Sequence, residues 1–256
     1  MTAHHPFLDH PGPIAFAHRG GTSVAPENTM PAFEYAVSLG YRYLETDVHR
    51  TLDGELVAFH DADLMRTCGI DRRIADMTAT EVAEVRVSGT APIPTMRELL
   101  QRWPEHRFNI DCKADDAVDP LATLLDETNA LDRVCIGAFS DARLGRLRRR
   151  YGSRLLTAMG PREIALLRLL RWWRGSGPRA AQVPVRGSDD GLLRHLVVTT
   201  GRLIGDAHHR AFPVHVWTIN DAGEMHRLLD LGVDGIMTDR PEMLREVLDD
   251  RGEWVS

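Results

Sequence analysis

Two pairs of charged residues stand two positions apart within runs of apolar or β-branched sequence. Glu45 and Asp47 form one pair, and Asp111 and Lys113 form the other. Because residues two apart on a β-strand point to the same face, the members of each pair are expected to project together. Neighbouring strands lie about 4.8 Å apart. If these two strands are adjacent, three carboxylates and one ammonium group share a small volume.

A group of three carboxylates is costly to bury unless positive charge accompanies it. A divalent cation would supply that charge, and oxygen ligands suit Mg²⁺ or Ca²⁺ better than zinc. The spacing therefore favours a site for one divalent cation, Mg²⁺ or Ca²⁺. The alternative is a structural network of ion pairs with Arg19, Arg50 or Lys113.

Two of the twelve histidines, His18 and His60, fall at the ends of predicted strands and are flanked by charged residues. Imidazole titrates near neutral pH, so a pair of histidines beside a metal indicates proton transfer. The alternative for any single histidine is a surface position, which most of the others are expected to occupy.

These residues need a scaffold, and short apolar runs alternate with amphipathic helical segments along the chain. The predicted strands are Ile14–His18, Tyr43–His49, Arg107–Lys113, Val134–Phe139, Leu155–Met159, Ala181–Val185, Val214–Thr218 and Gly235–Thr238. Strands that alternate with helices favour a (β/α)8 TIM barrel, whose sites lie at the carboxyl ends of the strands. The alternative is an open doubly wound sheet. That fold typically has a glycine-rich phosphate loop after a strand, and the sequence shows no convincing one.

Several helices have recognisable first turns. Thr95 and Glu98 form a capping box ahead of a run with apolar residues at helical spacing. Asp221 is predicted to begin a later helix, and Asp239 is predicted to cap the last one.

The interval between the second and third strands is too long for a simple connection. Glu55–His60 is predicted to form an extra short strand, and Thr78–Val85 a helix. Long excursions from a compact domain are usually functional. We expect one barrel domain, 1–256, with a small insertion after the second strand at approximately residues 50–93.

Short segments spread from about residue 14 to residue 248 carry a combined signal. They are His18-Arg19-Gly20, Pro26-Glu27-Asn28-Thr29, Glu45-x-Asp47, Asp53-Gly54, His60-Asp61, Asn109-Ile110-Asp111-Cys112-Lys113, Val216-Trp217-Thr218-Ile219-Asn220 and the run from Gly232 to Pro241. Each segment alone is a weak signal. In this order and combination, the chain resembles the glycerophosphodiester phosphodiesterases.

The resemblance implies a barrel with a divalent metal, Mg²⁺ or Ca²⁺, held by Glu45, Asp47 and the acid at position 111. The family often has glutamate where this chain has Asp111. Aspartate is one methylene shorter, so it would bind the metal through a shifted strand or a bridging water. It remains an oxygen ligand suited to the same ions.

The resemblance also implies a reaction, with His18 and His60 as the acid–base pair. The substrate would be a glycerophosphodiester, hydrolysed to glycerol 3-phosphate and an alcohol. A neighbouring glycerol hydroxyl would attack the phosphorus first, giving a cyclic phosphate that water then opens. The sequence does not distinguish the acid from the base.

Four further residues receive substrate roles from the resemblance. Arg19 and Lys113 would hold phosphate oxygens. Glu27 would contact the glycerol moiety, although a place in a first helical turn is the simpler alternative. Trp217 would form a wall of the glycerol pocket, and a buried core tryptophan is its alternative.

Two other reactions remain open at this point. A lysophospholipase D-type phosphodiesterase would use the same site on lysophospholipids at a membrane surface. A barrel aldolase would use Lys113, the only lysine of the chain, to form a Schiff base. Neighbouring carboxylates should keep that lysine protonated, which argues against the aldolase.

Charge and composition restrict the partners. The formal net charge is −6, which argues against nucleic acid. Residues 143–179 nevertheless hold eleven arginines and a single acid, Glu163. This stretch favours either a peripheral contact with an anionic membrane or a solvated outer helix of the barrel. With no apolar run long enough for a membrane span and no secretory signal, a cytoplasmic protein is expected.

Overall fold

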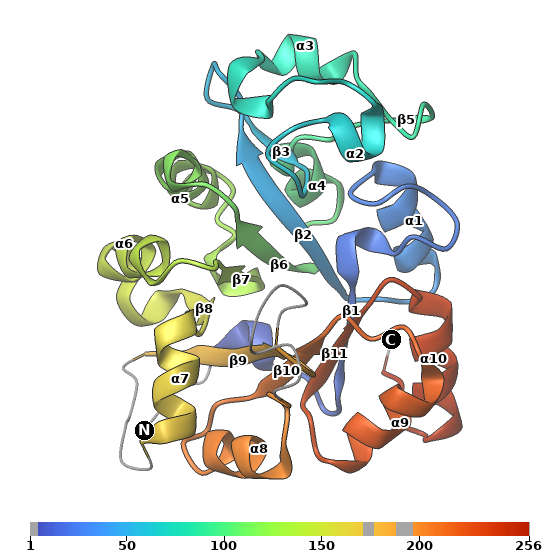
Figure 1. Ribbon diagram of the computed structural model, residues 1–256, viewed down its shortest axis with the longest axis vertical. Coiled ribbons are helices and arrows are strands. Elements are labelled where there is room, and N and C mark those ends of the chain that lie inside the picture. Colours follow the sequence, from blue (N-terminus) through green and yellow to red (C-terminus); the bar gives the residue numbers. More distant parts are fainter. Residues whose placement is uncertain (1–4, 171–176, 188–196, 256) are drawn as a thin grey trace.

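Eight parallel strands close into a barrel, which confirms the predicted fold. The computed structural model describes residues 5–170, 177–187 and 197–255, and Figure 1 shows their arrangement. The barrel strands are β1 (Ile14–Ala17), β2 (Tyr43–Arg50), β6 (Arg107–Cys112), β7 (Val134–Gly137), β8 (Leu156–Ala158), β9 (Arg179–Pro184), β10 (Val214–Trp217) and β11 (Gly235–Thr238). Because β1 pairs with both β2 and β11, the ring is complete.

The longer helices lie outside this ring of strands (Figure 1). They are α1 (Met30–Ser38), α4 (Met96–Arg102), α5 (Val118–Glu127), α6 (Asp141–Tyr151), α7 (Pro161–Leu169), α8 (Gly201–His208), α9 (Ala222–Asp230) and α10 (Pro241–Asp250). Short 3-10 helices occupy Pro6–Leu8, His18–Gly20, Ile74–Asp76, Asp115–Ala117, Leu131–Arg133 and Gly152–Arg154.

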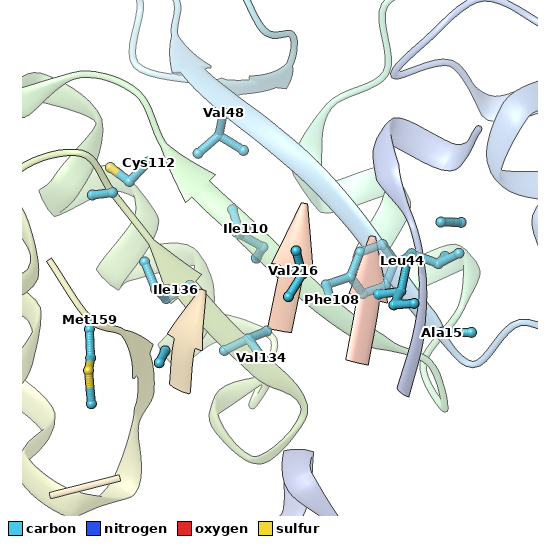
Figure 2. Packing of buried hydrophobic residues seen from close by; sticks show 14 of the residues in the cluster. Ala15, Leu44, Val48, Phe108, Ile110, Cys112, Val134, Ile136, Met159 and Val216 are labelled. Carbon is cyan, nitrogen blue, oxygen red and sulfur yellow. The ribbon is translucent and has the colours of Figure 1, made fainter. Parts of the chain in front are cut away.

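The outer faces of the strands are apolar and pack against the helices. Leu44 and Val48 of β2 and Phe108, Ile110 and Cys112 of β6 are fully buried in this layer, which Figure 2 shows. These residues alternate along each strand with the polar residues, as predicted. The alternation therefore sends the carboxylates of the same strands to the inside of the barrel.

The register of β2 and β6 determines which carboxylates meet. The two strands are parallel neighbours, with Asp47 opposite Asp111 and Glu45 opposite Asn109. The predicted adjacency of the two acidic strands is thus confirmed. Both aspartates lie near the carboxyl ends of their strands, which is the end where barrel enzymes build their sites.

Helix starts follow the predicted caps with one exception. Thr95 and Glu98 form the expected capping box of α4, and Asp221 caps α9. The prediction that Asp239 caps the last helix is wrong, because the N-cap of α10 is Arg240. The carboxylate of Asp239 binds side chains at the barrel mouth instead.

The segment between β2 and α4 forms a small unit at one edge of the barrel (Figure 1). Its elements are β3 (Leu56–Ala58), α2 (Met65–Cys68), α3 (Ala79–Ala83), β4 (Arg86–Val87) and β5 (Ala91–Pro92). β3 runs antiparallel to β2, and a separate apolar cluster fills the unit. All these elements fall inside the predicted insertion. The assignment of the whole chain to one domain stays a prediction.

An N-terminal turn packs against the amino ends of the strands. Phe7 is fully buried against Phe16 of β1 and Tyr43 of β2, with ring centroids 6.3 and 5.2 Å away. The Tyr43 hydroxyl donates a hydrogen bond of 2.9 Å to the Phe7 carbonyl. The amino end of the barrel is therefore filled by side chains.

Much of the basic stretch 143–179 is neutralised within the protein. Ion pairs join Arg143 to Asp115, Arg146 to Asp119, Arg148 and Arg179 to Glu163, and Arg150 to Asp126. These pairs favour the outer-helix interpretation, although the segment 171–176 lies outside the described residues. Contact with an anionic membrane stays a prediction. Within the described ranges, no helix is both long and apolar enough to cross a membrane.

A substitution in the apolar layer tests this packing. Ile136 of β7 is fully buried there (Figure 2). We expect Ile136→Ala to lower the free energy of unfolding by about 2–5 kcal/mol, and Ile136→Val by about 0.5–1.5 kcal/mol, because a larger cavity is left in the first case. Urea unfolding monitored by circular dichroism measures both values, and equal losses for the two variants would contradict the packing described.

Candidate active site

The predicted carboxylates and the single lysine meet at the mouth of the barrel. The Lys113 Nζ atom lies 2.8 Å from Asp47 Oδ1 and 2.7 Å from Asp111 Oδ2. The ammonium group therefore bridges the two neighbouring strands. Its pKa is raised, because the charges of Asp47 and Asp111 outweigh the burial that would lower it. A protonated amine is not a nucleophile, which argues against the Schiff-base reaction.

The pKa values of the two buried acids of β2 shift in opposite directions. Glu45 is 4% exposed, and its burial, next to the Asp47 charge, raises its pKa to about 7. Burial would also raise the pKa of Asp47, but the positive charges of Lys113 and Arg19 outweigh it and hold that pKa at about 2. The cluster thus has more acidic groups than its two basic side chains can fully neutralise.

The fit of this cluster to a divalent cation can be judged from its donors. All three acids offer hard oxygen ligands of the kind Mg²⁺ and Ca²⁺ take. Asp111 Oδ1 is buried and has no hydrogen-bond partner among the described residues. Among all the residues that the structure describes, no group of three His, Cys, Asp or Glu side chains is arranged so that it could hold a metal ion as it stands. The chemistry of the donors fits a cation, and direct ligation by Glu45, Asp47 and Asp111 stays a prediction.

His18 follows β1 and is held by a carboxylate from the next strand of the ring. Its Nδ1 lies 2.6 Å from Asp239 Oδ1, and Asn220 donates a bond of 2.7 Å to the other oxygen of Asp239. His18 Nε2 lies 3.8 Å from Glu45 Oε2. Burial would lower the pKa of His18, but the negative charges of Glu45 and Asp239 raise it overall.

His60 follows β3 and has a carboxylate partner of the same kind. Its Nδ1 lies 2.6 Å from Asp61 Oδ1, while its backbone carbonyl accepts a bond of 3.1 Å from His49 Nε2. Burial lowers the pKa of the His60 imidazole. In both His18 and His60 the carboxylate orients the ring through Nδ1, so Nε2 is the nitrogen left to exchange a proton.

Arg19 enters the cluster from a tight turn after β1. Its backbone has φ 53, and the following Gly20 has φ 82. A Cβ atom on Gly20 would lie 2.8 Å from backbone atoms of α1, so glycine is needed for this close approach. The turn directs the Arg19 N–H to Glu45 Oε2 at 3.0 Å and places Nε 3.1 Å from Asp47 Oδ2.

Glu27 is bound by two arginines. Its carboxylate accepts a bond of 3.0 Å from Arg19 Nη1 and two bonds, of 3.0 and 2.6 Å, from Arg66. Burial would raise the pKa of Glu27, but these two guanidinium groups lower it. Its predicted contact with the glycerol moiety stays a prediction.

An open cavity of about 680 Å³ lies between the insertion and the barrel. Its lining includes His60, Lys113 and Arg66, together with His49 and Met65. The volume is in the range of sites that bind small molecules. The predicted acid–base histidine and phosphate-binding lysine therefore face a space large enough for a small diester.

Trp217 stands at the end of β10 and is half-buried. Its ring packs edge-on against Phe139, with centroids 5.8 Å apart. Phe139 is 68% exposed, so this pair presents apolar surface at the mouth. The predicted role of Trp217 in the glycerol pocket stays a prediction.

The sequence analysis predicts no place in the site for three of these residues. It predicts a helix cap for Asp239 and no role for Asp61 or Arg66. The position of Asp239 directly after a barrel strand was a usable signal, because the same argument selects His18. Arg66 has no comparable signal, since it belongs to the insertion and reaches the site only through the fold.

Comparisons with known proteins agree with this geometry. The model of the "Glycerophosphoryl diester phosphodiesterase family" matches residues 18–243. A "Probable glycerophosphodiester phosphodiesterase 2" of Mycobacterium tuberculosis is 40% identical over 97% of this chain and 95% of its own length.

Two solved structures share the fold. A putative glycerophosphoryl diester phosphodiesterase from Silicibacter pomeroyi has a TM-score of 0.81 at 23% identity, over 98% of this chain and all of that one. A phosphodiesterase from Oleispira antarctica, solved with the product sn-glycerol-3-phosphate, has a TM-score of 0.77 at 20% identity, over 93% and 97% of the two chains.

A buried polar layer inside the barrel generates a prediction for stability. His215 is fully buried, and burial lowers its pKa from 6.5 to about 4. Between these values the unfolded chain binds a proton at this residue that the folded chain does not, so the contribution of His215 to stability falls as pH drops from 6.5 towards 4. The slope from this one group is at most about 1.4 kcal/mol per pH unit.

Urea unfolding across this pH range measures the effect. We expect His215→Gln, which leaves an uncharged polar group near Gln182, to show a shallower loss of stability on acidification than the unsubstituted protein. Parallel curves for the two proteins would contradict the assignment to His215.

Proposed function

Since this chain belongs to the glycerophosphoryl diester phosphodiesterase family and is a phosphoric diester hydrolase, we propose that it converts glycerophosphodiesters to glycerol 3-phosphate and an alcohol by histidine acid–base catalysis. The observation that supports this most strongly is the pair of histidines, each held at Nδ1 by an aspartate 2.6 Å away, beside a cluster of acids, Arg19 and Lys113. Proton transfer and neutralisation of a phosphate need these two kinds of group together.

Arg19 and Lys113 are the proposed contacts of the phosphate. A phosphodiester carries one negative charge, which is redistributed over the oxygens as the transition state forms. Arg19 offers planar N–H donors from the β1 side, and Lys113 offers a compact charge from the β6 side. Glu27 and Trp217 are proposed to border the glycerol part of the substrate.

The two histidines are proposed to move the protons. In the first step one ring accepts the proton of the attacking glycerol hydroxyl, the new O–P bond forms, and the other ring protonates the departing alkoxide. In the second step water opens the cyclic phosphate, and the two rings exchange roles. Asp239 and Asp61 stabilise each imidazolium as it forms.

Glu45, Asp47 and Asp111 would hold a divalent cation, Mg²⁺ or Ca²⁺. When bound, such a cation supplies positive charge to the phosphate oxygens. The acids themselves bury their charge next to Lys113 and Arg19, and the raised pKa of Glu45 indicates that the cluster can accept further positive charge.

A lysophospholipid substrate is the less favoured alternative. The relative that shares 40% of its residues with this chain is named for the glycerophosphodiester reaction. Five arginines of the basic stretch that could face a membrane are paired with acids of the protein.

Alanine substitutions test the histidines. We expect His18→Ala and His60→Ala each to lower kcat for glycerophosphocholine by at least about 100-fold, the lower end for a general acid or base. His208→Ala is the matched control, because His208 also lies 2.6 Å from an aspartate, Asp234, on a helix outside the barrel. Near-normal turnover by both site variants would exclude the assignment.

Removal of the cation tests the acids. We expect EDTA to abolish hydrolysis, and Mg²⁺ or Ca²⁺ to restore it. Asp47→Asn should weaken cation binding, measured by calorimetry, at least about 10-fold. That is the lower end of the loss of metal affinity caused by mutating residues that only hydrogen-bond to metal ligands. Asp115→Asn, a change in an exposed acid paired with Arg143, is the control. Full activity in EDTA, or equal binding by both variants, would rule out the proposed site.

A further inference from the structure

The side chain of Arg66, on α2 of the insertion, contacts two carboxylates that lie next to the proposed catalytic groups. Its Nη1 and Nη2 donate to the two oxygens of Glu27, at 3.0 and 2.6 Å. Its Nε donates to Asp61 Oδ2 at 2.5 Å. One planar guanidinium therefore binds two carboxylates from different parts of the chain, one before β2 and one after β3.

Each of these carboxylates holds a second residue with its other contacts. Asp61 Oδ1 lies 2.6 Å from His60 Nδ1, and Glu27 Oε1 accepts a bond of 3.0 Å from Arg19 Nη1. The contacts form a continuous chain from His60 through Asp61, Arg66 and Glu27 to Arg19.

We propose that Arg66 is a positioning residue of this enzyme, which orients His60 through Asp61 and Arg19 through Glu27. The inference rests on the proposed function, because that function supplies the roles of His60 and Arg19. It adds a residue from α2 to the part that the insertion plays in the reaction, since the insertion also carries His60 and Asp61.

Electrostatics explain why this position needs a guanidinium. Glu27 and Asp61 both carry a negative charge, and both lie against the same cation. Without it, the two like charges would repel each other across a short distance. Each carboxylate would then turn towards solvent, and the groups that they hold, Arg19 and His60, would follow. A lysine offers a point charge that cannot form the same three directed bonds.

The exposure of Arg66 separates this role from simple stabilisation. Its side chain is 48% exposed, and ion pairs at such exposed positions contribute little to stability. Arg72 offers a matched comparison within the same insertion. It is 46% exposed and donates two bonds of 3.1 Å to Glu81, which has no contact with the site among the described residues.

Steady-state kinetics on glycerophosphocholine test the proposal. We expect Arg66→Ala to lower kcat/KM about 10- to 100-fold, the range of one charge-assisted hydrogen bond. The fall in kcat reflects His60, and the rise in KM reflects Arg19.

Rescue and control variants accompany this measurement. Arg66→Lys should recover part of the lost kcat/KM. Added guanidinium chloride should partly restore the activity of Arg66→Ala, compared with the same concentration of sodium chloride. Arg72→Ala should keep unchanged kinetics. Equal kinetics for the two alanine variants would overturn the proposal.

Double variants test the two branches separately. In an Asp61→Asn background, Arg66→Ala should produce no further fall in kcat. In a Glu27→Gln background, it should produce no further rise in KM. If the full effect of Arg66→Ala persists in both backgrounds, Arg66 does not act through these carboxylates, and the proposal fails.

A measurement without substrate separates this inference from the proposed reaction. Nitrogen-15 NMR of the histidine rings reports the tautomer and hydrogen bonding of each imidazole. We expect Arg66→Ala to change the ring signals of His60 and to leave those of His18 unchanged, because His18 is held by Asp239. An unchanged His60 ring would overturn the inference whether or not the protein hydrolyses diesters. Absent hydrolysis with a changed His60 ring would contradict only the proposed function.

Discussion

The pairing of β2 with β6 is the constraint on which the rest of the site depends. This register puts Asp47 opposite Asp111, and it places the Lys113 ammonium between them. A shift of one residue would turn the acids outward into the apolar layer, where their charges would be unpaired. The outward side chains such as Ile110, buried against the helices, therefore stabilise the inward position of the acids as well as the fold.

Around this cluster the protein repeats one device, a side chain held by a second residue of opposite charge. Asp239 holds His18, Asp61 holds His60, and Glu27 holds Arg19. Such contacts fix orientation without touching the reacting atoms, and a site gains from them because little reorganisation remains when charge develops. The holding residues come from the position after β11, from the insertion and from the turn before α1, so distant segments of the chain cooperate.

The barrel and its inner acids were predictable because both follow from periodicity. Alternation along a strand places Glu45 and Asp47 on the same face whatever the neighbouring strand is. Contacts between distant segments have no such local signal. The position of Asp239 after a strand marks it as a candidate for the site, but it also resembles a helix cap because it stands two residues before Pro241. Its pairing with His18 appears only once β11 closes against β1. Arg66 was unpredictable for the same reason, since an exposed arginine in an insertion has many possible partners.

The filled amino end of the barrel restricts the paths by which substrate can enter and products can leave. Phe7, Phe16 and Tyr43 pack together there, so the interior of the described barrel provides no passage towards that end. Diester, alcohol and glycerol phosphate must then share the opening beside the insertion. A product that remains in the mouth blocks the next substrate. Because substrate and products use the same opening, glycerol phosphate is expected to inhibit competitively.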